Sequence, residues 1–408
     1  MAKFLTIDDI DFKNKVALVR VDFNSPIDPK TKKVLDDTRI RAHAQTTIKE
    51  LCEKGAKIVI LAHQGRPGDP DFTPLKQHAE ILGKILGKPV KYVEDLFGEK
   101  AQKAIKGLKS GEILVLENVR TFPDEQNKGT PEEHAKSEFV QKLAPLGDVF
   151  VNDAFAAAHR AHISIVGFTA VMPSVAGRIM EKELKALGRV LEAPEKPCVY
   201  ILGGAKADDS LEISRYVLKN NIADRILTGG VVGHLFLAAK GLDVGKPNME
   251  LLEKRELMEL VPGIQDLMNA YPGKIETPSD VAIEVEGKRK EITIEKLPTN
   301  YPVYDIGAKT VKKYRDIIRG AKSIVISGPV GVFENVEFSL GTREIFKAIA
   351  ASKAFSLVGG GHTVAAVEKL ELADKMSYVS TAGGALIEFL MGKRLAGVVA
   401  LEKAAAKA

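Results

Sequence analysis

Short runs of β-branched and other apolar residues recur along the whole chain, and longer stretches with helical spacing lie between them. Ten of these runs predict strands: Val16–Phe23, Lys57–His63, Val90–Val93, Ile113–Asn118, Val149–Asp153, Val199–Gly203, Arg225–Thr228, Ser323–Ser327, Ala354–Val358 and Ser377–Ser380. Their nearly continuous apolar character is typical of strands buried on both faces of a parallel sheet. The alternation of strands and helices predicts an α/β fold with parallel sheets.

Two segments allow more local predictions. Thr38–Lys54 has helical spacing, with Asp37 or Thr38 as its N-cap and Gly55 as its stop. Val281–Glu286 and Glu291–Glu295 instead alternate apolar and polar residues around Gly287 and Lys288. This second pattern predicts an antiparallel hairpin, which we expect at the edge of the second sheet.

The length of 408 residues is typical of two or three domains, and the pattern favours two. We expect Rossmann-like domains over residues 1–172 and 196–390, facing each other across a cleft. Residues 173–195 would join them through a helix over Arg178–Leu191, with Gly177 and Pro194 as hinge points. A helix between two sheets predicts a stiff connector with mobile ends.

Composition excludes several classes of protein. With 59 basic and 54 acidic residues the net charge is only +5, and aromatic residues make up 6% without any tryptophan, so nucleic acid is not an expected partner. No apolar run is long enough to span a membrane. The two cysteines, Cys52 and Cys198, cannot form a disulfide framework, and acids stand where a signal peptide needs apolar residues. We therefore expect a cytoplasmic protein without a membrane partner.

Arginines follow the strands of the first half. Arg39, Arg66, Arg120 and Arg160 each lie just beyond a predicted strand or at the start of the next helix. The carboxyl ends of parallel strands form the ligand crevice of an open α/β sheet, and guanidinium groups suit phosphate and carboxylate. One such arginine is an ordinary surface residue, but four at equivalent positions predict a pocket for a small anion.

Other polar residues at these strand ends are more ambiguous. Asp22 and Asn24 could hydrogen-bond a small phosphorylated acid, although an Asx turn explains either of them alone. His159 and His162 are three residues apart, but a zinc site needs three or four ligands and no cysteine or carboxylate lies at ligand spacing. We do not predict a metal site there.

Glycine clusters follow the strands of the second half. They are Gly203-Gly204-Ala205-Lys206, Gly229-Gly230, Gly359-Gly360-Gly361-His362-Thr363 and Gly383-Gly384. Each opens a predicted helix, whose free N–H groups and positive dipole end can hold phosphate, although one such loop alone could be only a tight turn. Neither a P-loop nor the dinucleotide fingerprint is present. The residues thus predict a phosphotransferase that uses a nucleotide and a small acid. Another two-domain kinase acting on a small carboxylic acid, or a catalytically silent binding protein on this fold, remains open.

Seven ordered motifs carry a resemblance to a known family. They are Arg20–Pro26 (RVDFNSP), His63–Pro67 (HQGRP), Leu116–Arg120 (LENVR), Asn152–His162 (NDAFAAAHRAH), Gly203–Lys206 (GGAK), Gly328–Glu334 (GPVGVFE) and Ser380–Ala385 (STAGGA). Together they closely resemble phosphoglycerate kinase, and the match runs from Arg20 to about Leu401. The Gly-His-Thr variant is most similar to archaeal members.

The resemblance implies glycolytic phosphoryl transfer between 1,3-bisphosphoglycerate and ADP, giving 3-phosphoglycerate and ATP, with Mg²⁺. It implies that the acid substrate is bound by Asp22, Phe23, Asn24, Arg39, His63, Gln64, Gly65, Arg66, Arg120 and Arg160. It implies that the nucleotide is bound by Lys206, Glu334, Gly360, Gly361, His362 and Thr363. We expect Arg39 and Lys206 to be catalytic, because transfer to an ionised carboxylate needs charge neutralisation rather than a general base.

Three further expectations accompany the resemblance. Residues 391–408 should pack back on the N-terminal domain, the domains should close by hinge bending, and the protein should be a monomer rather than a dimer. His362 stands where many members carry a magnesium-binding aspartate. Imidazole is a poor ligand for Mg²⁺, so the metal ligands are left unassigned.

Overall fold

The chain forms two compact units. The computed structural model describes residues 4–407. Unit 1 extends to Leu184 and includes the residues from Arg394 onward, and unit 2 is Lys185–Lys393. The division falls within helix α8 (Arg178–Leu191), whose bounds are those predicted from the sequence. Among residues 4–407, no helix is long and apolar enough to cross a membrane.

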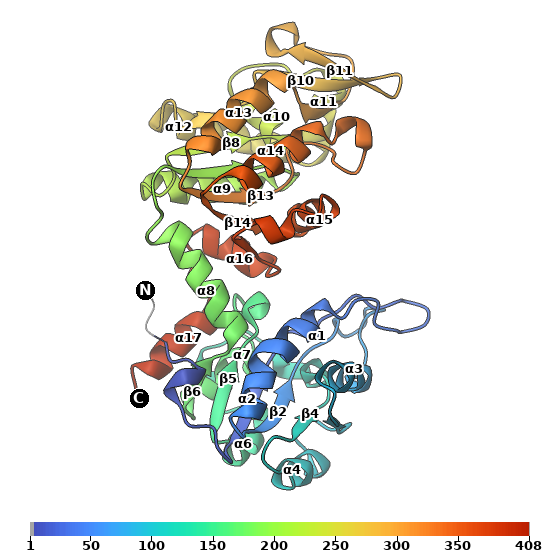
Figure 1. The fold of residues 1–408 in the computed structure, drawn as a ribbon, viewed down its shortest axis with the longest axis vertical. Helices are drawn as coiled ribbons and strands as arrows, with labels where there is room; N and C mark the ends of the chain where they lie inside the picture. The colour runs from blue at the N-terminus through green and yellow to red at the C-terminus, as the bar shows by residue number, and fades with distance from the viewer. Residues whose placement is uncertain (1–3, 408) are drawn as a thin grey trace. The chain divides into compact units, whose positions relative to one another are not determined.

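Unit 1 is built on a six-stranded parallel sheet in the order β3-β4-β2-β1-β5-β6. Its strands are β1 (Val16–Arg20), β2 (Lys57–Leu61), β3 (Lys91–Tyr92), β4 (Ile113–Val115), β5 (Val149–Asn152) and β6 (Ser174–Ala176). Its helices are α1 (Thr38–His43), α2 (Lys49–Glu53), α3 (Lys76–Leu86), α4 (Glu99–Lys106), α5 (Pro131–His134), α6 (Glu138–Leu143), α7 (Ile163–Val166) and α17 (Ala396–Ala405) (Figure 1).

Unit 2 has a second six-stranded parallel sheet, in the order β15-β14-β13-β7-β8-β9. Its strands are β7 (Cys198–Leu202), β8 (Arg225–Thr228), β9 (Ile275–Glu276), β13 (Ser323–Ser327), β14 (Phe355–Gly359) and β15 (Tyr378–Val379). Its helices are α9 (Ala207–Lys219), α10 (Gly230–Ala239), α11 (Lys246–Lys254), α12 (Val261–Ala270), α13 (Ala308–Gly320), α14 (Leu340–Ala351), α15 (Gly361–Lys369) and α16 (Gly384–Leu390). The predicted α/β fold with parallel sheets is confirmed. Strands β6 and β9, only three and two residues long, were not predicted.

The predicted hairpin exists, but its place in the fold was wrong. Strands β10 (Asp280–Val285) and β11 (Lys288–Thr293) pair antiparallel, and β12 (Val303–Ile306) pairs with β10 to complete a separate three-stranded sheet. The hairpin is therefore not the edge of the parallel sheet. The turn also lies one residue earlier than predicted, at Glu286 and Gly287, whose φ angles of 52° and 77° are those of a tight two-residue turn.

The helix predicted over Thr38–Lys54 is observed, with one irregularity. Helices α1 and α2 are continuous through a π-helical turn at Ala44–Ile48. The chain then leaves the helix at Gly55, whose φ of +74° explains the choice of glycine. Such π turns often occur at functional sites.

Helix α17 belongs to unit 1 although it ends the chain. Ala400 packs in a small core with Ala154 and Ile165, and the Gly397 amide donates to the Ala158 carbonyl at 2.8 Å. Figure 1 draws this helix in red beside β6 and α7. The last helix thus packs directly on the loop that follows β5.

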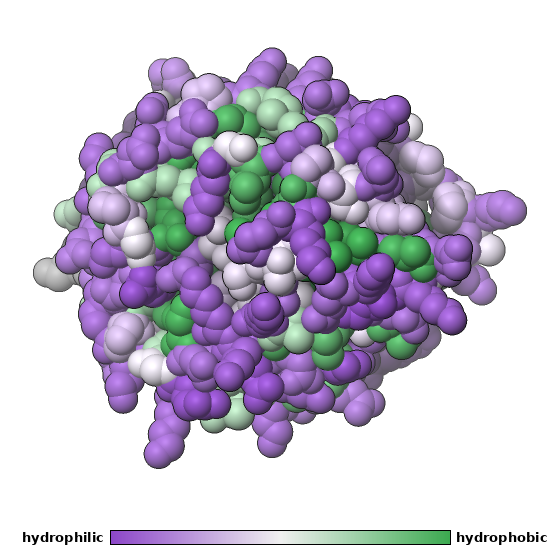
Figure 2. Space-filling view, turned by 90° about the horizontal axis from the view of Figure 1, so that it is seen from above, coloured by the Kyte–Doolittle hydropathy of each residue, from purple (hydrophilic) through white to green (hydrophobic). Residues whose placement is uncertain are grey.

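Both parallel sheets are covered by apolar cores. In unit 1, alternate residues of β1 face opposite layers, with Ala17 and Val19 in one cluster and Leu18 in the other. The face drawn in Figure 2 is largely hydrophilic, with hydrophobic residues in separate areas. The apolar runs that predicted buried strands therefore lie in the interior of the structure, as their sequence pattern indicates.

Candidate functional site

In unit 1, basic side chains gather at the carboxyl ends of β1, β2, β4 and β5. The group consists of Arg20, Arg39, His63, Arg66, Arg120, Arg160 and His162. The mutual influence of these groups on their pKa values indicates that they lie close together. The crevice expected at this edge of the sheet is therefore strongly cationic.

Arg20 and His63 form the buried floor of this group. Arg20 donates from Nε to Ser164 Oγ at 2.8 Å and from Nη2 to His63 Nδ1 at 3.1 Å. Burial, followed by the neighbouring arginines, holds the pKa of His63 well below its usual range. His63 is therefore neutral, and it contributes a polar atom rather than another positive charge.

Asp22, Asn24 and Arg39 are tied together by short contacts. Arg39, at the start of α1, forms an ion pair with Asp22 at 2.5 Å. The Asp22 carboxylate also accepts a hydrogen bond from the backbone N–H of Asn24 at 3.1 Å. Asn24 in turn accepts from the Gly65 amide at 2.8 Å. The loops after β1 and β2 are thus joined before any ligand binds.

Two residues of the expected acid site face inward. The Phe23 side chain is fully buried in the core. Gln64 is fully buried too, and its amide binds Ser25 N and O, Asp71 O and His78 Nε2. Both residues are closed to solvent as a whole, so their role here is to support the neighbouring loops.

Arg66, Arg120 and Arg160 carry the charge of the site. Within residues 4–407, none of the three has a carboxylate at ion-pair distance. Burial, and next the charge of Arg160, lower the pKa of Arg120 to about 10, while burial and Arg66 lower the pKa of Arg160. Like charges held together without counter-ions favour an anionic ligand.

Sequence reasoning missed the residues that support this cluster. Glu125, buried beneath it, accepts from Ser164 Oγ at 2.5 Å, and burial raises the pKa of Glu125 to about 7. Burial lowers the pKa of His162 to about 3, so this ring is neutral. The sequence analysis included Arg20 in the RVDFNSP motif but assigned it no role. Nothing in the sequence distinguishes Glu125 from an ordinary surface acid.

In unit 2, a cavity of about 970 Å³ opens at the carboxyl ends of the strands. It is lined by all six residues expected to bind nucleotide, namely Lys206, Glu334, Gly360, Gly361, His362 and Thr363. The two exposed side chains His362 and Glu334 approach to 3.9 Å. The Thr363 hydroxyl is buried and accepts from the Gly328 amide at 2.7 Å.

The glycine loops around this cavity pack against one another. The Gly204 amide donates to Pro329 O at 2.7 Å, and the Gly230 amide donates to Val330 O at 2.8 Å. A Cβ at Gly203 would lie 2.3 Å from Pro329 O. Without side chains, these glycines let the backbone segments pack in close contact. The amides of Gly204 and Gly230 already donate to carbonyl groups, so they are not free to bind phosphate.

The N–H groups that remain belong to the helix starts. Lys206 is the exposed N-cap of α9, and Gly360, with φ of +88°, is the N-cap of α15. The first-turn N–H groups of a helix have no acceptor within the helix. In this cavity α9 and α15 are therefore the elements suited to phosphate.

The cavity also contains residues that the sequence did not single out. Asp305 is fully buried, pairs with Arg289 at 2.7 Å and accepts from the Gly341 amide at 2.7 Å. Burial raises the pKa of Asp305 to about 6 despite this pair. His234 is a further lining residue, and burial lowers its pKa to about 4. Both were hidden from sequence analysis because they lie within or beside apolar runs.

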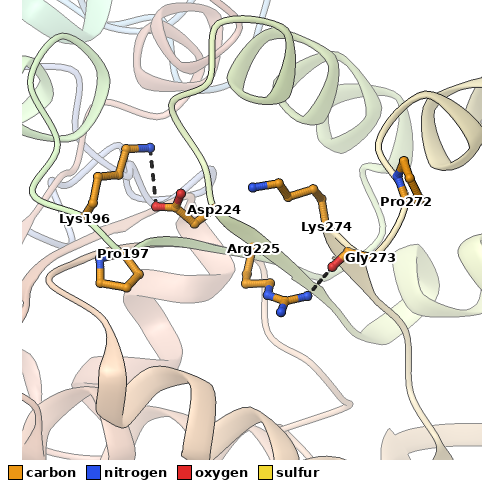
Figure 3. Close-up of a pocket in the computed structure, with 7 residues that line it drawn as sticks. All are labelled: Lys196, Pro197, Asp224, Arg225, Pro272, Gly273 and Lys274. Atoms are coloured by element: carbon orange, nitrogen blue, oxygen red, sulfur yellow. Dashed lines mark hydrogen bonds and ion pairs between the residues drawn. The ribbon is translucent and has the colours of Figure 1, made fainter.

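A second pocket of unit 2 is lined by three cationic residues, Lys196, Arg225 and Lys274, and the first two are engaged by neighbouring groups (Figure 3). Lys196 pairs with Asp224 at 3.4 Å, and Arg225 donates to the Gly273 carbonyl and to Glu276. It lies where β7 and β8 begin, away from the glycine loops. It is therefore a weaker candidate than the glycine-loop cavity.

Across residues 4–407, no group of three or more histidine, cysteine or acidic side chains is arranged to hold a metal ion. The carboxylates Asp209 and Glu334 line the cavity but belong to no such group. The cavity can thus contribute one or two oxygen ligands to a cation carried by a ligand.

Comparison with known proteins gives one consistent result. The family model for phosphoglycerate kinase matches residues 7–393. The phosphoglycerate kinase of Methanothermobacter thermautotrophicus is 49% identical over 401 residues, covering 98% of this chain and 97% of the relative. That of Pyrococcus furiosus is 45% identical over 398 residues, covering 97% and 96%.

Solved structures agree. The crystal structure of phosphoglycerate kinase from Pyrococcus horikoshii OT3 matches with a TM-score of 0.88 and 41% identity, covering 99% of each chain. The structure of the enzyme from Coxiella burnetii matches with a TM-score of 0.84 and 34% identity, covering 98% of this chain and 99% of that one.

Proposed function

The chain belongs to the phosphoglycerate kinase family, and from this premise we propose that the arginine cluster of unit 1 binds the phosphoglycerate and the cavity of unit 2 binds the nucleotide. The reaction is reversible phosphoryl transfer from 1,3-bisphosphoglycerate to ADP, giving 3-phosphoglycerate and ATP in glycolysis. The enzyme is a phosphotransferase with a carboxyl group as acceptor. The observation that carries the assignment of sites is the group of arginines without carboxylate partners.

Within unit 1, the roles follow from charge and accessibility. Arg66, Arg120 and Arg160 hold the phosphate of the substrate through their unpaired guanidinium groups. Asp22 and Asn24 orient its carboxylate end and hydroxyl, and neutral His63 offers a hydrogen bond without adding charge. Gly65 lets the backbone approach, with φ of +65°.

Arg39 and Lys206 are the proposed catalytic residues. The acceptor is an ionised carboxylate, so no proton has to be removed and the barrier comes from bringing negative groups together. Arg39 is about one-third exposed and held at 2.5 Å by Asp22, so its guanidinium is oriented yet accessible. Lys206, exposed at the start of α9, supplies the second positive charge.

The nucleotide is proposed to place its phosphates at the starts of α9 and α15. The N-caps Lys206 and Gly360 both line the cavity, which supports this placement. Glu334 is an exposed carboxylate suited to the ribose hydroxyls, while Gly361, His362 and Thr363 form the first turn of α15.

Mg²⁺ is proposed to arrive with the nucleotide. The donor set fits an ion that keeps its waters and its phosphate ligands, since Mg²⁺ favours oxygen and is often bound through only one or two carboxylates. Asp209, a lining carboxylate with no other role assigned here, is the residue available to hold it. Bound there, it would neutralise phosphate charge.

Because the two substrates are assigned to different units, the reaction requires them to meet. We propose residues 173–195 as the hinge segment between domains over 1–172 and 196–390, with the cleft closing to exclude water. Gly177 has a further constraint, because a Cβ there would lie 2.2 Å from Asp153 Oδ1. We propose a cytoplasmic monomer without nucleic-acid or membrane partners.

A coupled assay tests this function directly. The protein should phosphorylate 3-phosphoglycerate with ATP and should not phosphorylate acetate or aspartate under the same conditions. Turnover of another carboxylate in place of 3-phosphoglycerate would assign it to a different acid kinase. Binding of both ligands without turnover would assign it to a silent binding protein.

A further inference from the structure

Behind the arginine cluster lies a buried pair, His43 and Asp153. Their side chains are 4% and 0% exposed, and His43 Nδ1 lies 2.6 Å from Asp153 Oδ2. On its other side, His43 Nε2 is 3.1 Å from the backbone nitrogen of Asp22. The ring therefore bridges the loop after β1 and the loop after β5.

The partners determine the protonation of this ring. The Asp22 N–H can only donate, so His43 Nε2 must be the acceptor, and the carboxylate of Asp153 requires a donor at Nδ1. His43 is thus neutral with its proton on Nδ1, as assigned from these partners. Protonation of Nε2 would turn two donors toward each other.

The second oxygen of Asp153 caps α8. Asp153 Oδ1 accepts from the amides of Ile179 and Met180 at 2.8 and 3.2 Å, which satisfies two N–H groups that a helix start leaves free. Gly177 is in contact with the same carboxylate, so any larger residue there would displace it. Asp153 therefore connects His43 to the first turn of α8.

One face of the α1–α2 helix makes the same connection. Arg39, His43, Thr47 and Glu50 follow each other at intervals of four, four and three residues, so they share a face. Thr47 Oγ1 accepts from the Arg178 amide at 2.8 Å, and Glu50 pairs with the Arg178 guanidinium at 2.6 Å. Arg39 pairs with Asp22 at the opposite end of this face.

We propose that His43 is a positioning residue, which through Asp153 holds the Asp22–Arg39 pair in register with the first turn of α8. This inference rests on the proposed function, because it takes Asp22 and Arg39 to belong to the acid site. His43 does not touch substrate in this account. Its hydrogen bond to the backbone N–H of Asp22 fixes the position of Asp22, whose carboxylate in turn orients the Arg39 guanidinium.

The first test compares two variants of His43 in the full-length protein. His43→Phe keeps a planar ring against Phe23 but loses both hydrogen bonds, whereas the amide of His43→Gln can still donate and accept. We expect His43→Phe to lower kcat/KM for 3-phosphoglycerate roughly 10-fold, the scale of one or two hydrogen bonds, with KM for ATP unchanged. His43→Gln should recover most of this loss.

The second test changes the partner and keeps the helix cap. In Asp153→Asn the remaining oxygen can still accept from Ile179 and Met180, but the amide NH₂ now faces His43 Nδ1. His43 must then carry its proton on Nε2, facing the Asp22 N–H. Asp153→Asn should match the kinetic loss of His43→Phe, and the double variant should be no worse than either single one.

Leu82→Ala, which creates a cavity in the core of unit 1, is the control for kinetic changes that come from lost stability alone. Urea unfolding is measured on every variant. The proposal is overturned if His43→Phe and Asp153→Asn keep the wild-type KM and kcat for 3-phosphoglycerate. It is also overturned if they change both substrates alike, as Leu82→Ala does, or if His43→Gln is as impaired as His43→Phe. Arg39→Ala separates the two hypotheses. If Arg39→Ala leaves the rate intact, the proposed acid site is wrong. If Arg39→Ala lowers the rate but the His43 and Asp153 variants do not, the acid site stands and only the positioning role of His43 is rejected.

Discussion

The two candidate sites lie at the same edge of two similar sheets but are built from different materials. In unit 1 the site consists of charged and polar side chains, several of them buried and hydrogen-bonded, such as Arg20 to the His63 ring and Arg120 to the Gly65 carbonyl. In unit 2 it consists of backbone and empty volume, with a cavity of about 970 Å³ between glycine loops and only a few exposed charges. One fold thus supports a site based on charge and a site based on shape.

The difference has a physical basis. A small acid offers little surface, so its binding energy has to come from charge, and burying arginines makes each contact stronger. A nucleotide is large enough to be recognised through contact area, so glycines that let backbone segments approach are sufficient. Changes of charge should therefore affect unit 1 most, and changes of volume should affect unit 2 most.

The largest effect should come from adding one methyl group to the glycine loops. Gly328 has φ of +89°, and a Cβ there would lie 2.1 Å from Gly203 O. Gly328→Ala should lower the free energy of unfolding by about 2–6 kcal/mol, from backbone strain and overpacking, and should weaken ADP binding. Gly361→Ala, in the same cavity but with no atom within 4 Å of its Cβ, should leave stability nearly unchanged in urea unfolding. Equal stabilities of the two variants would contradict the packing role of the loops.

Removing the proposed catalytic charge of unit 1 should act on rate instead. Arg39→Ala should lower kcat about 10²–10³-fold, or about 2.7–4 kcal/mol, while ADP affinity stays near that of the wild type. Arg41→Ala is the matched control, because Arg41 lies on the same helix and pairs only with the exposed Asp37. Steady-state kinetics with calorimetry for ADP would measure both. A near-normal kcat for Arg39→Ala removes this residue from the mechanism.

Glu125 tests how the charged site affects stability. Burial raises the pKa of this carboxyl to about 7, so the folded protein keeps a proton that the unfolded chain releases above its ordinary value of 4.5. Since the folded state binds more protons, stability should fall as pH rises from about 4.5 to 7 and then level off. Glu125→Gln should remove up to about 3 kcal/mol of this fall, since one pKa unit corresponds to about 1.4 kcal/mol. Urea unfolding at pH 5 and pH 8 measures it, and an identical fall in both proteins would show that Glu125 does not titrate there.

The smallest effects test whether the two sites bind independently. Calorimetry should detect 3-phosphoglycerate binding without nucleotide, because all of the proposed acid-site residues belong to unit 1. Arg66→Ala, a change at an exposed side chain, should weaken that binding roughly 10-fold and leave ADP binding unchanged. Absence of 3-phosphoglycerate binding until ADP is added would contradict independent sites.

The repeating pattern was sufficient for much of the fold. The strands at Arg225–Thr228 and Ser323–Ser327 and the helix at Arg178–Leu191 have the bounds that their residues predict, because buried strands and amphipathic helices carry a periodic signal. Strands β6 and β9 are too short to carry that signal. The hairpin shows the same limit, because alternation predicts a pair of strands but not which third strand joins them.

The sequence by itself determined which residues to consider. Arginines and glycines placed after apolar runs identified the two groups, because strand ends in a parallel sheet meet at one edge. Only the tertiary structure decided what each residue does there. Phe23 and Gln64 face inward, and the amides of Gly204 and Gly230 bind other loops. His43 joins Asp22 to Asp153, which lies 110 positions beyond His43 in the chain. Burial, protonation and hydrogen-bond partners depend on contacts between distant segments, and a local pattern of residues does not contain them.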